Sequence, residues 1–173
     1  GADLVCICDL NEELVAERAR QYGASCWTTD YEELLNRDDI DAVSVVTPDF
    51  LHREVAVAAA EAGKHILLEK PMATTVEDCQ AMIDASEANG VTLMVDFHNR
   101  WNPAMWGIKK RLASGEMGTP QMLSLRLNDT IYVPTEMLSW GGESTVVWFI
   151  GSHSVDLARW FFDDEITRVY SVA

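Results

Sequence analysis

The segment His65-Ile66-Leu67-Leu68-Glu69-Lys70-Pro71 decides how the first half of this chain is expected to fold. Its first four residues form a short run that is typical of a buried strand in a parallel sheet. A carboxylate, an ammonium group and a rigid imino acid follow at the carboxyl end of that strand. Open parallel sheets bind their ligands at this end, so the tripeptide is a candidate functional site.

Lys70 is a candidate acid–base residue, because burial at a cleft can lower the pKa of a lysine into the working range of a catalyst. Pro71 restricts Lys70 to an extended conformation and allows a cis peptide bond between the two. The alternative is an ordinary strand end followed by a turn, with a surface ion pair.

Strands and capped helices alternate on both sides of this segment. Further strands are expected at residues 4–8, 25–28, 42–46 and 91–97. Helices are expected between them, beginning after Asn11, Asp30, Asp49 and Thr75 and ending near residues 22, 35, 63 and 88. Such strict alternation indicates an α/β fold, a doubly wound parallel sheet with helices on both faces.

The pattern changes after residue 97, where we expect a boundary between a domain at residues 1–98 and a second one at 99–173. Helices are predicted at residues 103–113 and 148–162, and residues 128–143 look irregular. Polar and apolar side chains alternate at 121–127 and 167–172, which predicts half-exposed strands. The second region thus looks like part of an α+β domain with a mainly antiparallel sheet.

A doubly wound dinucleotide-binding domain begins with a strand and a Gly-rich turn that holds the pyrophosphate, and this chain contains no GxGxxG. It begins where the second strand is expected, and Asp9 stands where an acid binds the ribose hydroxyls. Asp9 also suits the start of a helix. We expect an incomplete Rossmann sheet that lacks its first βα unit, in a chain missing the rest of its second domain.

Bulk composition excludes several function classes. The net charge of −15 argues against binding to nucleic acid or to an anionic membrane surface. No apolar run approaches the roughly 20 residues that span a bilayer, and no signal peptide is recognised, so we expect a cytoplasmic protein. The four cysteines lack ligand spacing, which argues against a metal site or a disulfide.

Five segments in order resemble the glucose–fructose oxidoreductase / inositol dehydrogenase (Gfo/Idh/MocA) family. One of them is nearly identical to the family signature AGKHVL-x-EKP. The segments are Cys8-Asp9, Val46-Thr47-Pro48-Asp49-Phe50-Leu51-His52, Ala62-Gly63-Lys64-His65-Ile66-Leu67-Leu68-Glu69-Lys70-Pro71, Phe97-His98-Asn99-Arg100-Trp101-Asn102-Pro103 and Gly151-Ser152-His153-Ser154-Val155-Asp156-Leu157-Ala158-Arg159-Trp160.

The resemblance implies an NAD(P)-dependent oxidoreductase that acts on a sugar, a polyol or a related hydroxyl compound and forms homo-oligomers at full length. It implies Lys70 and His153 as the acid–base pair. The implied cofactor residues are Asp9, Thr47, Pro48, His52, Glu69 and Lys70, and the implied substrate residues are Lys70, Arg100, Asp156 and His153. NAD is favoured over NADP, because Leu10 after Asp9 offers nothing to a 2′-phosphate.

One position departs from the family pattern. Many of its dehydrogenases carry an aspartate four residues before the catalytic histidine, and Phe149 stands there in this chain. A phenyl ring cannot orient an imidazole by hydrogen bonding. Two alternatives therefore stay open: a catalytically silent NAD-binding regulatory or interaction module, and a fragment that is inactive by itself.

Three further observations concern aromatic and imidazole side chains. His65 lies inside a predicted strand and is expected to be structural, whereas His98 lies near a strand end and could reach the cleft. Four tryptophans could stack on a sugar, although packing is the better expectation for the two on predicted helices; they are Trp101, Trp106, Trp148 and Trp160.

Overall fold

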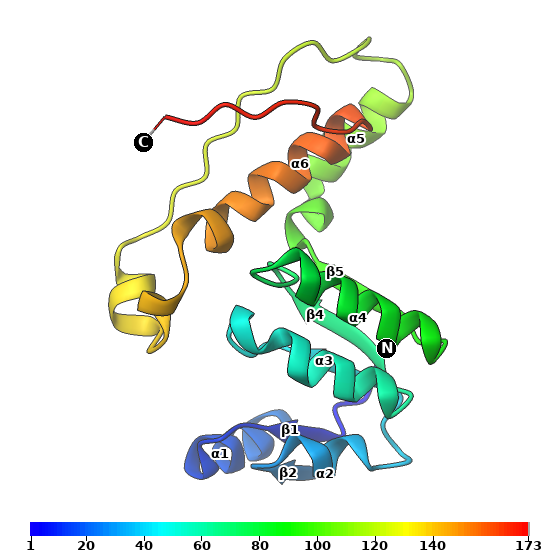
Figure 1. The fold of residues 1–173 in the computed structure, drawn as a ribbon, viewed down its shortest axis with the longest axis vertical. Helices are drawn as coiled ribbons and strands as arrows, with labels where there is room; N and C mark the ends of the chain where they lie inside the picture. Colours follow the sequence, from blue (N-terminus) through cyan, green and yellow to red (C-terminus); the bar gives the residue numbers. More distant parts are fainter. Residues whose placement is uncertain (173) are drawn as a thin grey trace. The chain divides into compact units, whose positions relative to one another are not determined.

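The computed structural model describes residues 1–172, which divide into two compact units (Figure 1). The first unit is Gly1–Val95, and the second begins at Asp96. Within the described residues, no helix combines the length and apolarity that crossing a membrane requires.

The first unit alternates short strands with helices, as the sequence predicts. Its strands are β1 (Cys6–Cys8), β2 (Cys26–Thr28), β3 (Ala42–Val45), β4 (His65–Glu69) and β5 (Leu93–Asp96), the last of which ends in the second unit. Its helices are α1 (Glu12–Tyr22), α2 (Tyr31–Leu35), α3 (His52–Glu61), which follows the 3₁₀ turn η1 (Asp49–Leu51), and α4 (Val76–Ala88).

Side-chain caps begin three of these helices where the sequence predicts them. The carboxamide of Asn11 accepts a hydrogen bond from the Leu14 N–H at the start of α1. Asp30 caps α2, and the hydroxyl of Thr75 caps α4. These side chains satisfy N–H groups that have no partner inside the helix, which is why they mark helix starts so reliably.

Two separate sheets occupy the first unit in place of the single predicted sheet. Strands β1 and β2 are parallel, with Cys6 opposite Cys26. The second sheet has the order β3-β4-β5, and its β3 and β4 are parallel. In the usual doubly wound order 3-2-1-4-5-6, strand 1 lies between two such groups, and the described residues contain no strand between them.

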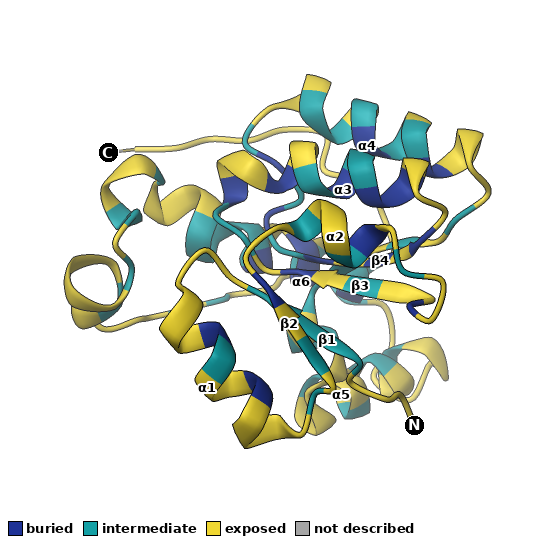
Figure 2. Ribbon diagram, turned by 90° about the horizontal axis from the view of Figure 1, so that it is seen from below, coloured by how far each residue is buried: buried dark blue, intermediate teal, exposed yellow. Residues whose placement is uncertain are grey.

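The core of the first unit lies between β3, β4 and the helices α3 and α4, where the buried positions of both helices are dark in Figure 2. Ala56, Ala59 and Ala60 give α3 a surface of small side chains, which allows α4 to pack closely. Leu68 on β4 and Met82 on α4 are fully buried. Complete burial of one such side chain stabilises the fold by about 1.5–3 kcal/mol.

The second unit is built mainly from helices and turns. The 3₁₀ turn η2 (His98–Trp101) leads into α5 (Pro103–Ala113), which Asn102 caps. A long connection contains the π-helical turn η3 (Val133–Met137) and the 3₁₀ turn η4 (Gly141–Glu143). A second π-helical turn, η5 (Val147–Gly151), precedes α6 (Ser152–Phe162).

Three expectations for the second unit need correction. Residues 121–127 and 167–172 do not pair as strands within the described part of the chain, because a strand needs a neighbour for its backbone groups. The helix expected at 148–162 becomes regular only at Ser152. The β-branched Val147 and the flexible Gly151 weaken α-helix formation before that point, so this stretch forms η5.

Candidate functional site

Two turns of the first unit lie next to each other at the ends of neighbouring strands. Thr47 and Pro48 follow β3, and Lys70 and Pro71 follow β4. Because β3 and β4 are parallel and Val45 lies opposite Leu68, both turns emerge at the same edge of the sheet. The structure thus brings together four of the residues implicated by the sequence.

His52 joins these two turns from the interior. The residue is 1% exposed; Nε2 lies 2.9 Å from the carbonyl oxygen of Thr47, and Nδ1 lies 3.0 Å from that of Pro71. A further contact of 3.2 Å joins Nδ1 to the Met72 carbonyl oxygen. His52 was expected to line the cofactor cleft, which stays a prediction, and the structure places its ring nitrogens against the backbone of the two turns.

Lys70 lies at the strand end with its backbone fixed by its neighbour. The Lys70 N–H donates a hydrogen bond of 3.0 Å to Oε2 of Glu69, and both residues are half-buried. The Lys70–Pro71 peptide bond is cis, one of the two forms that the sequence allows.

Asp9 and Thr47 present polar groups that suit a nucleotide. Asp9 is exposed at the end of β1, and its Oδ1 accepts a hydrogen bond of 2.8 Å from the Asn11 N–H. The Oγ1 atom of Thr47 is buried and has no hydrogen-bond partner among the described residues. A buried hydroxyl without a partner is costly, so a ligand group that bonds to it would be favoured. These residues therefore fit the ribose and amide groups of NAD.

Burial keeps the thiols of Cys6 and Cys8, on the strand that precedes Asp9, in the neutral form. Burial, reinforced by the negative charges of Asp30 and Asp9, raises the pKa of Cys8. Burial and a hydrogen bond with Cys26 raise the pKa of Cys6 to about 12. The thiolate is the reactive form of cysteine, so both residues are expected to be chemically quiet at neutral pH.

In the second unit, Arg100 and Asp156 are paired with each other. Nε of Arg100 lies 2.9 Å from Oδ2 of Asp156, and its Nη2 lies 2.5 Å from Oδ1. The guanidinium also lies over the rings of Phe97 and Trp160, at 5.9 and 5.8 Å from their centroids. Both residues were expected on the substrate side, and the structure shows them linking η2 to α6.

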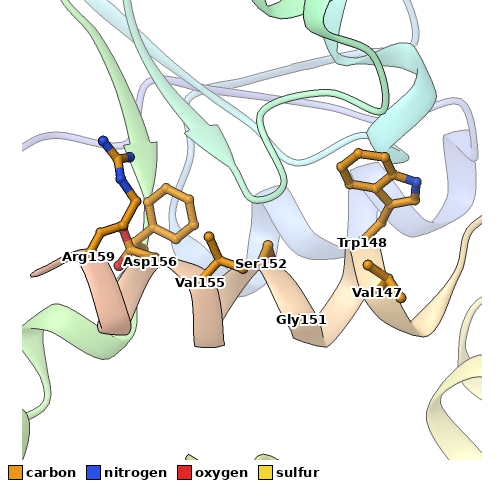
Figure 3. Close-up of a pocket in the computed structure, with 8 residues that line it drawn as sticks. Val147, Trp148, Gly151, Ser152, Val155, Asp156 and Arg159 are labelled. Carbon is orange, nitrogen blue, oxygen red and sulfur yellow. The ribbon is translucent and has the colours of Figure 1, made fainter. Parts of the chain in front are cut away.

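A pocket of about 290 Å³ lies beside α6 (Figure 3). Phe97, Trp148 and Val155 give it an apolar lining, while Asp156 and Ser152 add polar atoms. The Oγ atom of Ser152 is buried and lacks a hydrogen-bond partner within residues 1–172. An apolar wall with a few polar groups is the usual lining of a small-molecule site.

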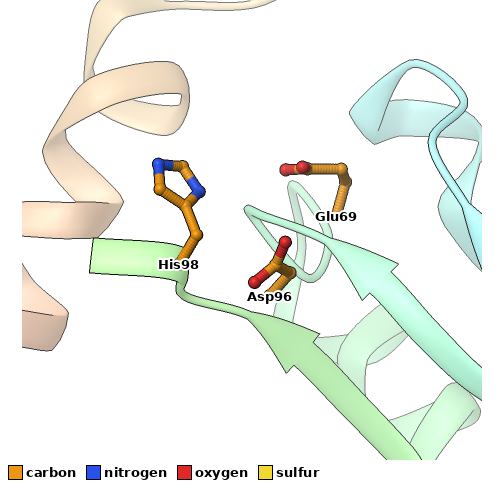
Figure 4. Close-up of side chains that lie close together, drawn as sticks. All are labelled: Glu69, Asp96 and His98. Carbon is orange, nitrogen blue, oxygen red and sulfur yellow. The ribbon is translucent and has the colours of Figure 1, made fainter. Parts of the chain in front are cut away.

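His153 lies in the first turn of α6 and is 8% exposed. Its ring centroid is 4.7 Å from that of His98, with the planes inclined by 70°. Asp96 ends β5 two residues before His98 (Figure 4), and a carboxylate oxygen of Asp96 lies within 4.8 Å of a ring nitrogen of His98. The sequence did not decide whether His98 reaches the cleft, and it did not implicate Asp96. Their i, i+2 spacing at a strand end, which places two side chains on one face, could have indicated the pair.

Several other aromatic residues of the second unit contact one another. Trp106 stacks on Trp101 and on Trp160, with centroid separations of 6.1 Å in both pairs. Phe149, at the position where an aspartate was expected, meets the ring of Trp140 edge-on at 6.4 Å. Three of the four tryptophans considered for sugar stacking thus contact one another, although Trp101 and Trp106 remain exposed, while Trp148 lines the pocket.

Comparison with protein families matches both parts of the chain. Residues 1–97 match the oxidoreductase family with an NAD-binding Rossmann fold (GFO_IDH_MocA). Residues 105–173 match the GFO/IDH/MocA C-terminal domain.

Curated proteins and solved structures agree with these matches. The chain is 39% identical to levoglucosan dehydrogenase of Pseudarthrobacter phenanthrenivorans, over 89% of this chain and 41% of that protein. It is 34% identical to scyllo-inositol 2-dehydrogenase (NAD(+)) of Bacillus subtilis, over 98% and 49%. The structure of levoglucosan dehydrogenase in complex with NADH and levoglucosan aligns with a TM-score of 0.76 at 36% identity, over 91% of this chain and 44% of that one. The chain thus spans about half the length, or less, of these relatives.

Proposed function

Because the chain belongs to the oxidoreductase family with an NAD-binding Rossmann fold, we propose that the full-length protein is an NAD-dependent dehydrogenase acting on a sugar or polyol hydroxyl. Residues 1–98 would form the cofactor domain and residues 99–173 part of the substrate domain. Homo-oligomers are expected at full length. The names of two relatives, levoglucosan dehydrogenase and scyllo-inositol 2-dehydrogenase (NAD(+)), support this substrate class.

The paired turns after β3 and β4 carry this proposal. They place the Thr47 hydroxyl and the Glu69-Lys70 dipeptide at one edge of a parallel sheet, with a ring nitrogen of His52 within 3.0 Å of a carbonyl oxygen of each turn. Ligands of open α/β sheets bind at this edge. Asp9, at the end of β1, would hold the ribose hydroxyls, and Thr47 with Pro48 would line the cofactor cleft.

NAD, when bound, supplies the hydride acceptor. The chain must then supply a group that takes the hydroxyl proton and one that polarises the carbinol oxygen. Lys70 and His153 are the proposed pair, because ammonium and imidazole groups can both exchange protons near neutral pH when suitably placed. Arg100 and Asp156 would support the substrate side through their mutual ion pair.

The test is a screen of the full-length protein against sugars and polyols, following NADH formation, together with the variant Lys70→Ala. We expect turnover with at least one substrate, and a loss in Lys70→Ala of about 10²–10⁴-fold, the usual contribution of an acid–base group. NADH binding, measured by energy transfer from tryptophan, should persist in the variant. Lys110→Ala changes an exposed lysine of α5 and serves as the matched control.

Phe149 favours a second candidate, a catalytically silent NAD-binding regulatory module. Its ring packs against Trp140, so it offers no hydrogen bond to a catalytic imidazole. Saturable NADH binding without turnover on any sugar or polyol would support this candidate over the dehydrogenase. Equal turnover in Lys70→Ala and the parent protein would reject the proposed role of Lys70.

A further inference from the structure

We propose that Asp96 and His98 form a proton relay behind His153, a role that rests on the proposed dehydrogenase function. The three side chains lie in sequence: the Asp96 carboxylate is within 4.8 Å of a His98 ring nitrogen, and the His98 ring is 4.7 Å from that of His153. None of the motifs that indicate the family's chemistry includes Asp96.

The difference in solvent exposure between His153 and His98 sets the proposed direction of proton transfer. His153 is buried in α6, whereas His98 is exposed on η2. A base inside a closed site must pass its proton to solvent before the next turnover. An exposed imidazole in contact with a buried one provides that route, because each ring can bind and release a proton near neutral pH.

The phenyl ring of Phe149, which cannot form a hydrogen bond to an imidazole, explains why another source of support is proposed here. Where an aspartate would orient and support the imidazole, Phe149 packs against Trp140. Asp96 supplies a carboxylate from another part of the chain, and it acts through His98. The proposed order is therefore carboxylate, exposed imidazole and buried imidazole, with Asp96 within 4.8 Å of a His98 ring nitrogen and the two imidazole centroids 4.7 Å apart.

The charged side chains of Arg100 and Asp156 in this unit are paired with each other. Arg100 on η2 is bonded at two points to Asp156 on α6, and the ring of Phe97 lies 6.5 Å from that of His153. Asp96 places a carboxylate oxygen within 4.8 Å of a ring nitrogen of His98.

The proton balance is simple. During substrate oxidation, His153 accepts the hydroxyl proton and becomes an imidazolium. That proton passes to His98 as the His153 N–H bond breaks and a His98 N–H bond forms, and His98 then releases it to water. Each ring ends neutral, and no oxidant or reductant takes part in the relay.

The first test uses nuclear magnetic resonance of the full-length protein labelled at histidine. Two adjacent imidazoles that exchange charge titrate as a coupled pair, so the resonance of His153 should show two steps with pH. In His98→Asn it should show one step, while Asp38→Asn, an exposed aspartate of the first unit, should leave it unchanged. A His153 curve that is identical in His98→Asn and the parent protein would overturn the relay.

The second test uses turnover. His98→Asn and Asp96→Asn should each lower kcat by about tenfold or more, within the range of acid–base assistance, with little change in KM. Added imidazole should restore part of the activity of His98→Asn. The Asp38→Asn control should keep full activity, and imidazole should not change it. Unchanged kcat in both relay variants would contradict the proposal. If the parent protein turns over no substrate, the dehydrogenase function fails, and the titration alone decides whether the two histidines are coupled.

Discussion

Arg100 and Asp156 form a two-point ion pair that joins η2 to α6 across 56 positions of sequence. The Asp156 side chain is 6% exposed and the Arg100 side chain 39%. The pair therefore holds together the two segments that carry His98 and His153. Its geometry matches the planar fork of arginine, which a lysine cannot reproduce.

Removing Arg100 should destabilise the second unit. Arg100→Ala leaves the Asp156 carboxylate buried without its partner, which is expected to cost about 1.5–3 kcal/mol. Arg100→Lys retains the charge and should cost less than the alanine variant. Urea unfolding measures both values, and equal losses in the two variants would show that packing on Phe97 and Trp160 matters more than charge.

Thr75→Ala should lower the free energy of unfolding by about 1 kcal/mol, the usual loss for an N-cap. Its hydroxyl accepts a hydrogen bond from the Asp78 N–H at 3.1 Å and donates one to Oδ2 of Asp78 at 2.7 Å. Thr75→Ser keeps the hydroxyl and should stay close to the parent. Thermal or urea unfolding with a helix signal provides the measurement; a serine variant as weak as the alanine one would contradict the capping role.

Protonation of Asp78 should contribute to the loss of folding stability in acid. The hydrogen bond from Thr75, followed by the ion pair with Arg53, lowers the pKa of Asp78 below its ordinary value of 3.8. Since the folded-state pKa is the lower one, the contribution of Asp78 is fully present above its unfolded pKa and is lost as the pH falls through the folded value. Unfolding measured from pH 7 downward should therefore show a shallower acid loss in Asp78→Asn than in the parent, and parallel curves would exclude this contribution.

His52→Ala should weaken the first unit and NADH binding together. The substitution leaves the carbonyl groups of Thr47 and Pro71 without their buried partner, at a cost of about 1–3 kcal/mol. It also frees the two turns to move independently, so the NADH dissociation constant should rise. Urea unfolding and fluorescence titration check the two effects. Normal stability with weakened NADH binding would instead indicate direct contact between His52 and the cofactor.

Cys6 should react slowly with iodoacetamide in the folded protein. With a pKa raised to about 12 by burial and by Cys26, almost none of it is thiolate at neutral pH. The alkylation rate should rise about tenfold per pH unit, because the thiolate fraction does so below the pKa. Peptide mass spectrometry in native buffer and in denaturant gives the rates, and equal rates in the two conditions would contradict protection by the fold.

Helices and strands could be predicted from the sequence where interactions between neighbouring residues define them. The cap at Thr75 and the helix that follows it, the cap at Asn11, and the strand that ends at Glu69 depend on residues a few positions apart. The alternating segment 121–127 illustrates the limit of such reasoning. Its pattern predicts a half-exposed strand, yet a strand forms only where another strand accepts its hydrogen bonds, and the described chain provides none there.

The sequence by itself determined the α/β alternation, the helix caps and the position of Lys70 at a strand end, because short-range hydrogen bonding and side-chain periodicity act between near neighbours. Only the tertiary structure decided that His52 supports two turns from inside, that Arg100 pairs with Asp156, and that His98 meets His153. Apart from the contact of His52 with Thr47, five positions away, these contacts join residues 19 to 56 positions apart. Chain folding places such residues together, and no local pattern encodes the distance between them.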